Sequence, residues 1–467
     1  MKKFTNSIFV TLLLTAGAWS SNAQELPKIF GKTASVNPEN GLIRCASSEY
    51  EHHLREKYGM ESREEFEAWL APKVKQQKQK RLQKSANSTN EVITIPVVVH
   101  VIHNGDAEGS NENIAYEQVL SQITVLNQDY RRMVNTPGWN ENIVGADTEI
   151  EFCLAQRDPQ GNPTNGVDRV NLGEASWGSS NPDEMIENID DNVKPVTIWN
   201  PQKYLNIWVL NFGNQSGLLG YAQFPNNSGV SGLPANNGSS NTDGVVIGYR
   251  YFGSKAIYAQ GQYDTQNMYI YGRTATHEVG HYLGLLHVSG DSGSCSVNAA
   301  DSNNDYCPDT PATSGYNYTC SFVDSCPSAP GVDMIENYME YTNDACMNVF
   351  TEDQKDRMVA VLNNATRRVS LKTSDGCQAP VGAIDGFGMK NIYLYPNPAQ
   401  TVVTVSGVDG ELPDSLTIFN SLGQVVNTVK VSTDSDLTIN TSAYANGVYM
   451  IKVDKGVQTK TFKFVKN

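Results

Sequence analysis

Runs and periodic repeats of apolar residues divide the chain into regions of different character. The β-branched run 95–102 predicts a buried strand, and apolar residues at positions 119, 120, 123, 126 and 130 predict a helix over 115–131. We expect further strands at 149–155, 205–210 and 245–249, an extended segment at 216–225 and a helix at 274–285. This order predicts an α/β (α+β) domain over 85–377 in which helices back a mixed twisted sheet.

The pattern changes after Cys377. Residues 378–390 contain one proline and three glycines and indicate a linker. Beyond it, short strand-like segments are separated by turn signals such as Asn446 and Gly447. We expect strands at 392–395, 402–406, 415–420, 424–429, 448–453 and 459–465. They predict a small all-β sandwich over 391–467.

The first 23 residues have the three parts of a signal peptide: Lys2 and Lys3, an apolar core over 8–18, and small residues up to Ala23. The core is too short to span a membrane, and no later stretch reaches 18 apolar residues, so we expect no transmembrane segment. In an exported protein the eight cysteines are expected to form disulfides. Four of them lie within 295–326, an irregular stretch that needs such cross-links.

Charge is uneven along the chain. The formal net charge is −15, yet residues 1–84 carry 14 basic and nine acidic side chains. The acidic remainder would be repelled by phosphate backbones, which argues against nucleic acid as a partner. Residues 24–84 indicate a pro-segment with helical composition over 49–70. The basic run at 73–84 indicates either a protease-sensitive connector or a solvated helix face.

Three of the seven histidines lie within residues 277–287. His277 and His281, at positions i and i+4, share one face of the predicted helix and can reach one ion. Gly284 can adopt a left-handed conformation, end the helix and bring His287 back as a third ligand. Three neutral imidazoles predict a zinc site with one open position for water.

Glu278 follows the first of these ligands and is placed to act on that water. Zinc lowers the pKa of bound water to about 7, and Glu278 would take its proton and pass it to a leaving amine. The pattern therefore predicts a zinc endopeptidase that acts on proteins or peptides. A binding protein with structural zinc is disfavoured, because structural sites are closed by a fourth ligand. A thermolysin-like enzyme with a Glu as third ligand is the second enzyme interpretation.

The long zinc motif resembles that of the metzincins and, within that clan, of the pappalysins, especially the bacterial ulilysin-like members. Residues 337–341 (Asn-Tyr-Met-Glu-Tyr) are similar to the Met-turn of this family, and residues 346–351 also match. The resemblance covers roughly 90–375. It implies that Met339 forms an apolar floor beneath the metal and that Tyr341 hydrogen-bonds the transition-state oxyanion.

The resemblance also implies two disulfides, although spacing alone leaves three pairings of four cysteines open. The implied pairs are Cys295–Cys326 and Cys320–Cys346. The partners of Cys153, Cys307 and Cys377 stay open.

Two further ligand sites follow from the same resemblance. It implies a structural calcium ion, for which Asp305, Asp309 and Thr310 are the candidate ligands, since hard oxygens suit Ca²⁺. A solvated acidic loop is the alternative. Asp344 matches the position that lines the S1′ pocket, and a carboxylate there would favour Arg or Lys at P1′. A surface Asp that caps a turn is the alternative.

The segment Arg44-Cys45-Ala46 resembles the cysteine switch of the family. A thiolate is a good zinc ligand and would occupy the open position in a latent precursor. This makes the pro-segment an inhibitor of its own enzyme. A disulfide through Cys45 is the alternative.

The C-terminal region resembles the sorting domain of the type IX secretion pathway of Bacteroidetes. The resemblance rests on residues 395–399, 418–423, 446–449 and the lysine-rich end 460–466. It implies export by that machinery and an extracellular or cell-surface location. A substrate- or carbohydrate-binding module of similar fold is the alternative.

Overall fold

The computed structural model describes residues 27–467 apart from 84–91, 214–215, 227–239, 292, 296–304, 381–391, 407–411 and 456–457. The predicted signal peptide, the boundary after residue 84 and most of the linker lie outside the described residues. Among the helices that the structure describes, none is long and apolar enough to cross a membrane.

The central sheet of the larger body has the strand order β4-β3-β6-β8-β7, and β5 pairs with the second half of β3. Its strands are β3 (Ile93–His103), β4 (Ile150–Leu154), β5 (Val167–Asn171), β6 (Leu205–Leu210), β7 (Gly220–Ala222) and β8 (Val245–Gly248). All neighbours are parallel except β7, which is antiparallel to β8 and forms one edge. The mixed sheet expected from the sequence is confirmed.

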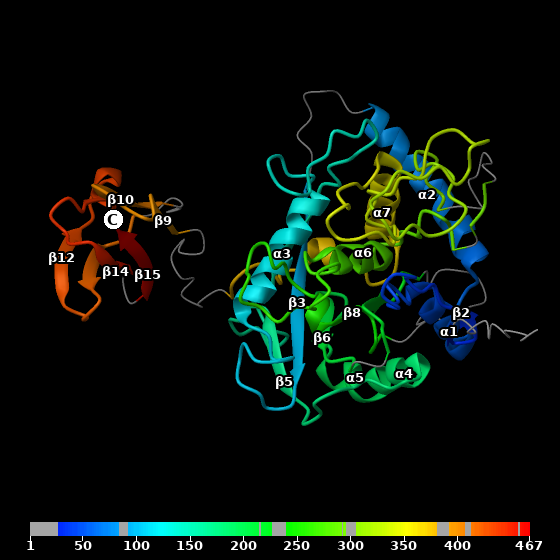
Figure 1. The fold of residues 1–467 in the computed structure, drawn as a ribbon, viewed down its shortest axis with the longest axis horizontal. Helices are drawn as coiled ribbons and strands as arrows, with labels where there is room; N and C mark the ends of the chain where they lie inside the picture. Colours follow the sequence, from blue (N-terminus) through cyan, green and yellow to red (C-terminus); the bar gives the residue numbers. More distant parts are fainter. Residues whose placement is uncertain are drawn as a thin grey trace, which may run out of the picture.

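Helices cover both faces of this sheet (Figure 1). On one face α3 (Tyr116–Tyr130) and α6 (Arg273–Tyr282) pack over the odd-numbered valines of β3. On the other face α4 (Pro182–Asn192) and α5 (Lys194–Thr197) lie over Trp208 and Val246. Neither α4 nor α5 was expected from the sequence, and α5 has only one turn. They matter because they define a second core.

Residues 27–83 form part of the same folded body rather than a loose leader. They contain β1 (Lys28–Ile29), β2 (Lys32–Thr33), α1 (Ser47–Tyr58) and α2 (Arg63–Gln83). Their apolar side chains join the second core at Ile29, Ala34, Ile43, Ala46, Tyr50 and Leu54. Burial of such side chains is a main stabilising term in folding. Residues 27–83 therefore complete the α4 side of the sheet.

Helix α2 lies along α7 (Glu352–Asn364), as the blue and yellow helices of Figure 1 show. The contact has an apolar part at Phe66, Leu70, Ala360, Val361 and Ala365. Lys78 Nζ lies 2.6 Å from Asp353 and Arg81 Nη2 lies 2.8 Å from Asp356. Residues 73–83 are thus helical, and Lys78 and Arg81 pair with α7. Protease sensitivity of this run stays a prediction.

Residues 392–467 form two antiparallel sheets with their own core. One has the order β13-β10-β9 and the other β12-β11-β14-β15. The strands are β9 (Tyr393–Tyr395), β10 (Val402–Ser406), β11 (Ser415–Asn420), β12 (Val425–Lys430), β13 (Thr438–Asn440), β14 (Gly447–Lys455) and β15 (Gln458–Lys466). The all-β prediction is confirmed, and only β13 was not expected.

Candidate metal centre and active site

Helix α6 carries the first half of the metal motif through the middle of the protein. Every residue of this helix is buried, including His277, Glu278 and His281. A Cβ at Gly280 would lie 2.5 Å from Met339 Sδ, so the absence of a side chain lets the Met-turn pack directly against the helix. Met339 thus packs on α6 at Gly280, between the positions of His277 and His281, and its role as an apolar floor beneath a metal stays a prediction.

Gly284 ends this helix with a φ of +91°. A side chain at this position would be strained by the backbone and would also meet Val361 at 2.8 Å. The resulting turn reverses the chain and returns His287 to the other two histidines. The sequence-based expectation for Gly284 matches this geometry.

The three imidazoles converge on one point. The Nε2 atoms of His277, His281 and His287 lie 3.0–3.2 Å from one another. On the far side of each ring, Nδ1 donates to an oxygen: His277 to the carbonyl of Tyr338, His281 to that of Leu285, and His287 to Asp291. Each Nε2 therefore presents its lone pair to the common centre, as metal-binding histidines do.

The donor chemistry of this centre fits a zinc ion. Burial and neighbouring imidazoles hold the pKa values of His277 and His281 well below their usual range, so these rings are neutral ligands. Cys45 adds a thiol, and the four donor atoms lie within 4.8 Å of one another. It is the one such cluster of histidine, cysteine and acidic side chains among the described residues. Nitrogen and sulfur donors in this number are typical of zinc.

Cys45 reaches this centre from the segment before α1. It is buried and forms no disulfide. Its Sγ lies 3.4 Å from Oε2 of Glu278, and the hydroxyl of Ser47 donates to the same oxygen at 2.6 Å. Burial raises the pKa of Glu278 to about 8, although the donors of Ser47 and Cys45 act in the opposite direction. The carboxylate expected to act as base is thus held by the pro-segment.

Two tyrosines stand beside the metal ligands. The ring centroid of Tyr341 lies 4.9 Å from that of His287 and 5.8 Å from that of His277. Tyr316 stacks on Tyr341 at 4.1 Å and its hydroxyl donates to Asp291 at 3.1 Å. Tyr341 therefore lies next to the three imidazoles, and its role towards an oxyanion stays a prediction.

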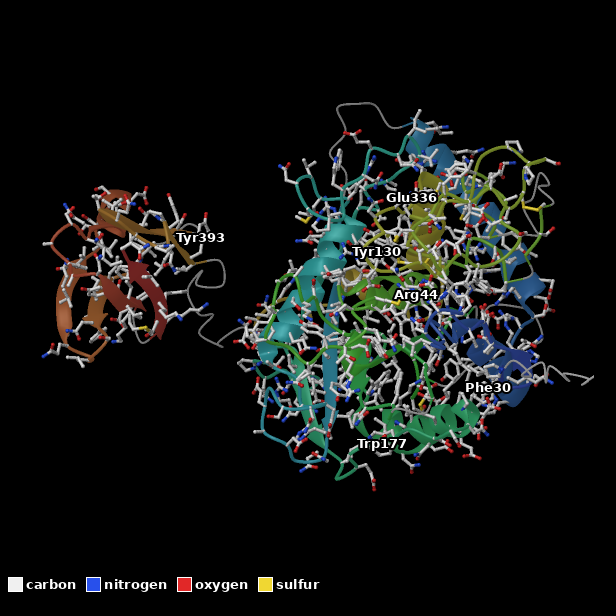
Figure 2. The ribbon with its side chains drawn as sticks, viewed as in Figure 1. Phe30, Arg44, Tyr130, Trp177, Glu336 and Tyr393 are labelled. Atoms are coloured by element: carbon white, nitrogen blue, oxygen red, sulfur yellow. A yellow bond between two sulfur atoms is a disulfide. The ribbon has the colours of Figure 1, made fainter. Side chains whose placement is uncertain are left out.

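Arg44, the residue before Cys45, enters a pocket of the catalytic body. Both terminal nitrogens of its guanidinium lie 3.2 Å from Oδ1 of Asp344, and the group lies over the ring of Tyr269. Both charged groups are at most 1% exposed, and Figure 2 shows Arg44 among packed side chains. Asp344 also accepts the backbone N–H groups of Tyr271 and Arg273. Asp344 is therefore a buried acceptor rather than a surface residue, and its role in an S1′ pocket stays a prediction.

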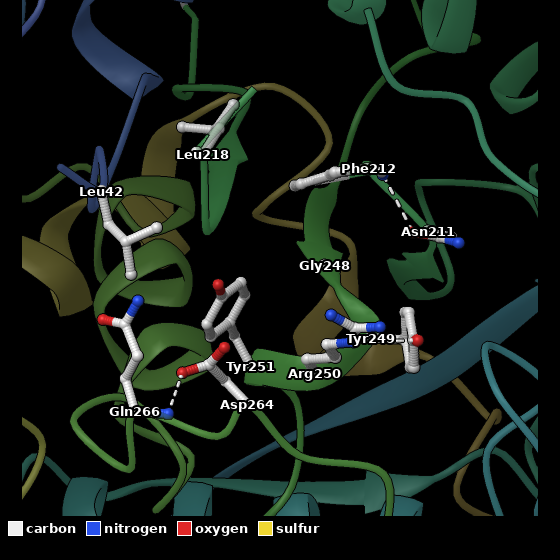
Figure 3. Close-up of a pocket in the computed structure, with 12 residues that line it drawn as sticks. Leu42, Asn211, Phe212, Leu218, Gly248, Tyr249, Arg250, Tyr251, Asp264 and Gln266 are labelled. Atoms are coloured by element: carbon white, nitrogen blue, oxygen red, sulfur yellow. Dashed lines mark hydrogen bonds between the residues drawn. The ribbon is translucent and has the colours of Figure 1, made fainter. Parts of the chain in front are cut away.

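Leu42, two residues before Arg44, borders a cavity of its own. This cavity of about 200 Å³ lies between Leu42 and the ends of β6 and β8, lined in part by Leu218, Tyr249 and Asp264 (Figure 3).

The residues expected to bind calcium have other partners. Asp305 accepts the hydroxyl of Thr310 and a backbone N–H. Asp309 accepts the hydroxyl of Thr351 at 2.7 Å and the N–H of Asp353, so it caps the start of α7. These contacts give the calcium site no support, and it stays a prediction.

Six cysteines are paired. The bonds join Cys295 with Cys326 and Cys320 with Cys346, the pairs that the resemblance implied. The third joins Cys153 of β4 to Cys377 at the end of the catalytic body. Cys307 is buried and free, like Cys45.

The structure also adds Ser47, Asp291 and Tyr316 to the site. Asp291 lies four residues after His287, a spacing that could have identified it. Ser47 and Tyr316 come from distant segments, and nothing in their local sequence marks them.

Comparison with known proteins agrees with this geometry. Residues 187–363 match the family described as pregnancy-associated plasma protein-A, a peptidase family, and residues 393–467 match a secretion system C-terminal sorting domain. An extracellular metalloprotease of Arthroderma benhamiae is 32% identical over 267 residues, which are 57% of this chain and 76% of the relative. One from Neurospora crassa is 34% identical over 56% of this chain and 78% of the relative.

A solved structure is similar as well. Mature mirolysin of Tannerella forsythia, in complex with a cleaved peptide, is 39% identical and gives a TM-score of 0.50 over 63% of this chain and 100% of the mirolysin chain. The metzincin fold of these relatives implies a catalytic zinc. The chain therefore belongs to the pregnancy-associated plasma protein-A (pappalysin) family of metalloendopeptidases and ends in a type IX sorting domain for secretion or cell-surface attachment.

Proposed function

We propose that the full chain is a latent zinc endopeptidase whose pro-segment, residues 24–84, keeps the active site closed until it is removed. The observation that carries this proposal is the convergence of Cys45 with His277, His281 and His287. The three histidines would hold the zinc, and the Cys45 thiolate would take the position that an attacking water needs. When bound, zinc supplies Lewis acidity, which polarises a carbonyl and makes water acidic near neutral pH.

Glu278 is the proposed general base. Once Ser47 and Cys45 leave, its carboxylate is free to accept a proton from the attacking water and to pass it to the leaving amine. Tyr341 is the proposed donor to the oxyanion that develops on the scissile carbonyl. Both roles use side chains that the fold already holds beside the imidazoles.

The Asp344 pocket supports a preference for Arg or Lys at P1′, because it already accepts a guanidinium. Followed from its amino end to its carboxyl end, a substrate of this kind would meet the metal first and the pocket second. The pro-segment meets them in the opposite order, Arg44 in the pocket and then Cys45 at the metal centre. It therefore crosses the cleft against the direction of a substrate, which is a reason why it blocks the site without being cut there.

The proposed order of parts is a signal peptide (1–23), the pro-segment (24–84), the protease domain (85–377), a linker (378–390) and the sorting domain (391–467). If basic residues are preferred at P1′, the run 73–84 offers bonds for self-processing. The bonds of this run up to Gln83 lie in α2, so α2 must unwind before they can be cut. N-terminal sequencing of the secreted form locates the processing site.

Casein digestion by the processed, secreted enzyme tests the activity. We expect digestion that a chelator abolishes, and its loss in Glu278→Ala with the zinc content unchanged. His287→Ala should lose both zinc and activity. Activity in the presence of the chelator, or zinc binding without His287, would overturn the proposal. Cleavage-site profiling with a peptide library separately tests P1′: apolar residues there would remove the role given to Asp344.

A further inference from the structure

Tyr50 of the pro-segment occupies a closed pocket in the catalytic body and is 0% exposed. Its hydroxyl donates to Oδ2 of Asp190 at 2.6 Å. Its ring meets that of Tyr221 edge-on, with centroids 5.0 Å apart. The side chain thus has both an aromatic wall and a charged acceptor, which are the two features that recognise a phenol.

The pocket is built by four elements of the protease domain. Asp190 comes from α4, Lys194 from α5, Trp208 from β6 and Tyr221 from β7. Lys194 is also fully buried, pairs with Asp190 at 2.7 Å, and lies 4.6–5.5 Å from the ring centroids of Tyr50, Trp208 and Tyr221. The hydroxyl of Tyr221 has no hydrogen-bond partner among the described residues. The pocket is therefore a buried ion pair enclosed by aromatic rings. Removal of the pro-segment would take the ring of Tyr50 out of it.

This pocket adjoins the active-site cleft. Tyr221 lies in the edge strand β7, and the pro-segment runs beside that strand, with the N–H of Ala46 bonded to the carbonyl of Gly220. Ser47 contacts both Glu278 and the N–H of Ala222. Tyr50 follows one turn of α1 later. Arg44 precedes Cys45 in the chain and Tyr50 follows it. If the pro-segment runs against the direction of a substrate, as proposed above, the part after Cys45 covers the side of the substrate residues before the scissile bond.

We infer that in the processed enzyme this pocket is a subsite for a tyrosine side chain of the bound polypeptide, on the amino-terminal side of the scissile bond. The inference rests on the proposed removal of the pro-segment, which vacates the position of Tyr50. A phenylalanine would contact the same rings but leave Oδ2 of Asp190 without the hydroxyl that now donates to it. Since a hydrogen bond to a charged acceptor contributes about 1.5–3 kcal/mol, tyrosine is favoured at least about tenfold.

Fluorogenic peptides with Arg at P1′ test this with the processed enzyme. Tyrosine is moved through P2 to P6 and compared at each position with phenylalanine and O-methyltyrosine, which keeps the ring but cannot donate. We expect one position at which tyrosine lowers KM about tenfold relative to both, with kcat nearly unchanged. Equal KM values for tyrosine and O-methyltyrosine at every position would overturn the inference.

Two matched variants assign the effect to the pocket. Asp190→Asn weakens the acceptor and should reduce the tyrosine preference several-fold, whereas Asp191→Asn, its exposed neighbour on α4, should leave it unchanged. An equal effect of both variants contradicts the assignment. If Asp190→Asn does not fold, the peptide series on the unaltered enzyme still decides. Failure of the proposed function is distinct, because the processed enzyme would then not digest casein at all.

Discussion

The hydroxyl of Ser47 donates a 2.6 Å hydrogen bond to Oε2 of Glu278, so a side chain of the proposed pro-segment holds the carboxyl group that we propose as the general base. A bond to this buried acceptor is expected to stabilise the closed form by about 1.5–3 kcal/mol. Ser47→Ala should therefore raise the activity of the unprocessed precursor about tenfold. Ser180→Ala, which alters an exposed serine in the loop before α4, is the control and should leave the activity unchanged. Equal latency in both variants would count against a role for Ser47.

Cys45 should contribute more to latency than Ser47, because it supplies a zinc ligand rather than a hydrogen bond. Cys45→Ser is expected to give a precursor that activates early or degrades itself. Cys307→Ser removes the other free buried thiol and serves as the control. The measurement is peptide hydrolysis by the unprocessed chain in the first minutes after purification. Unchanged latency of Cys45→Ser would refute the cysteine switch.

Asp344→Asn should change specificity rather than chemistry. The pocket would keep its shape and lose the charge that a basic P1′ side chain needs. For processed enzyme, kcat/KM for a peptide with Arg at P1′ should fall about tenfold to a hundredfold. A matched peptide with Leu at P1′ should change little. A parallel fall for both peptides would show that Asp344 acts on stability instead.

The catalytic body depends on a buried network centred on Asp243. Its carboxylate accepts from Arg367 at 2.6 Å and from Arg368 at 2.8 and 2.9 Å. Asp243→Asn leaves buried guanidinium groups without their counter-charge and should cost about 3 kcal/mol or more of unfolding free energy. Asp375→Asn, in partly exposed ion pairs, should cost less than about 1 kcal/mol. Urea unfolding at neutral pH measures both.

The same network predicts acid sensitivity. Burial alone would raise the pKa of Asp243, but Arg368 and Arg367 outweigh it and lower the pKa to about 2. Because this lies below the unfolded value of about 3.9, the contribution is complete above about pH 4. It is lost as the pH falls from about 4 to about 2. Over this range the thermal unfolding temperature should fall more steeply with decreasing pH for the unaltered chain than for Asp243→Asn. Identical slopes would contradict the assignment.

Residues 391–467 should be needed for export and not for catalysis, since the sandwich has its own core. A chain truncated after residue 390 is expected to remain inside the producing cell and, once isolated and processed, to digest casein. Cell fractionation and the casein assay measure the two properties. Release of the truncated enzyme outside the cell would favour a binding module over a sorting domain.

Local sequence determined the parts of this protein whose geometry is set by nearby residues. The helical period places His277 and His281 on one face, and Gly284 permits the turn that returns His287, all within eleven residues. The β-branched run of β3 and the alternation in the C-terminal strands likewise follow from short-range preferences. The family resemblance added the Met-turn and the two disulfides around it.

Only the tertiary structure decided how the pro-segment is held. Arg44 and Asp344 lie 300 residues apart in sequence, and the pocket of Tyr50 is assembled from two helices and two strands. No local pattern encodes such contacts, because they depend on which faces of distant elements pack together. For the same reason the basic end of α2 looked like a solvent-facing run, although it pairs with acids of α7. The sequence by itself specified the catalytic group, and the packing of the chain specified what covers it.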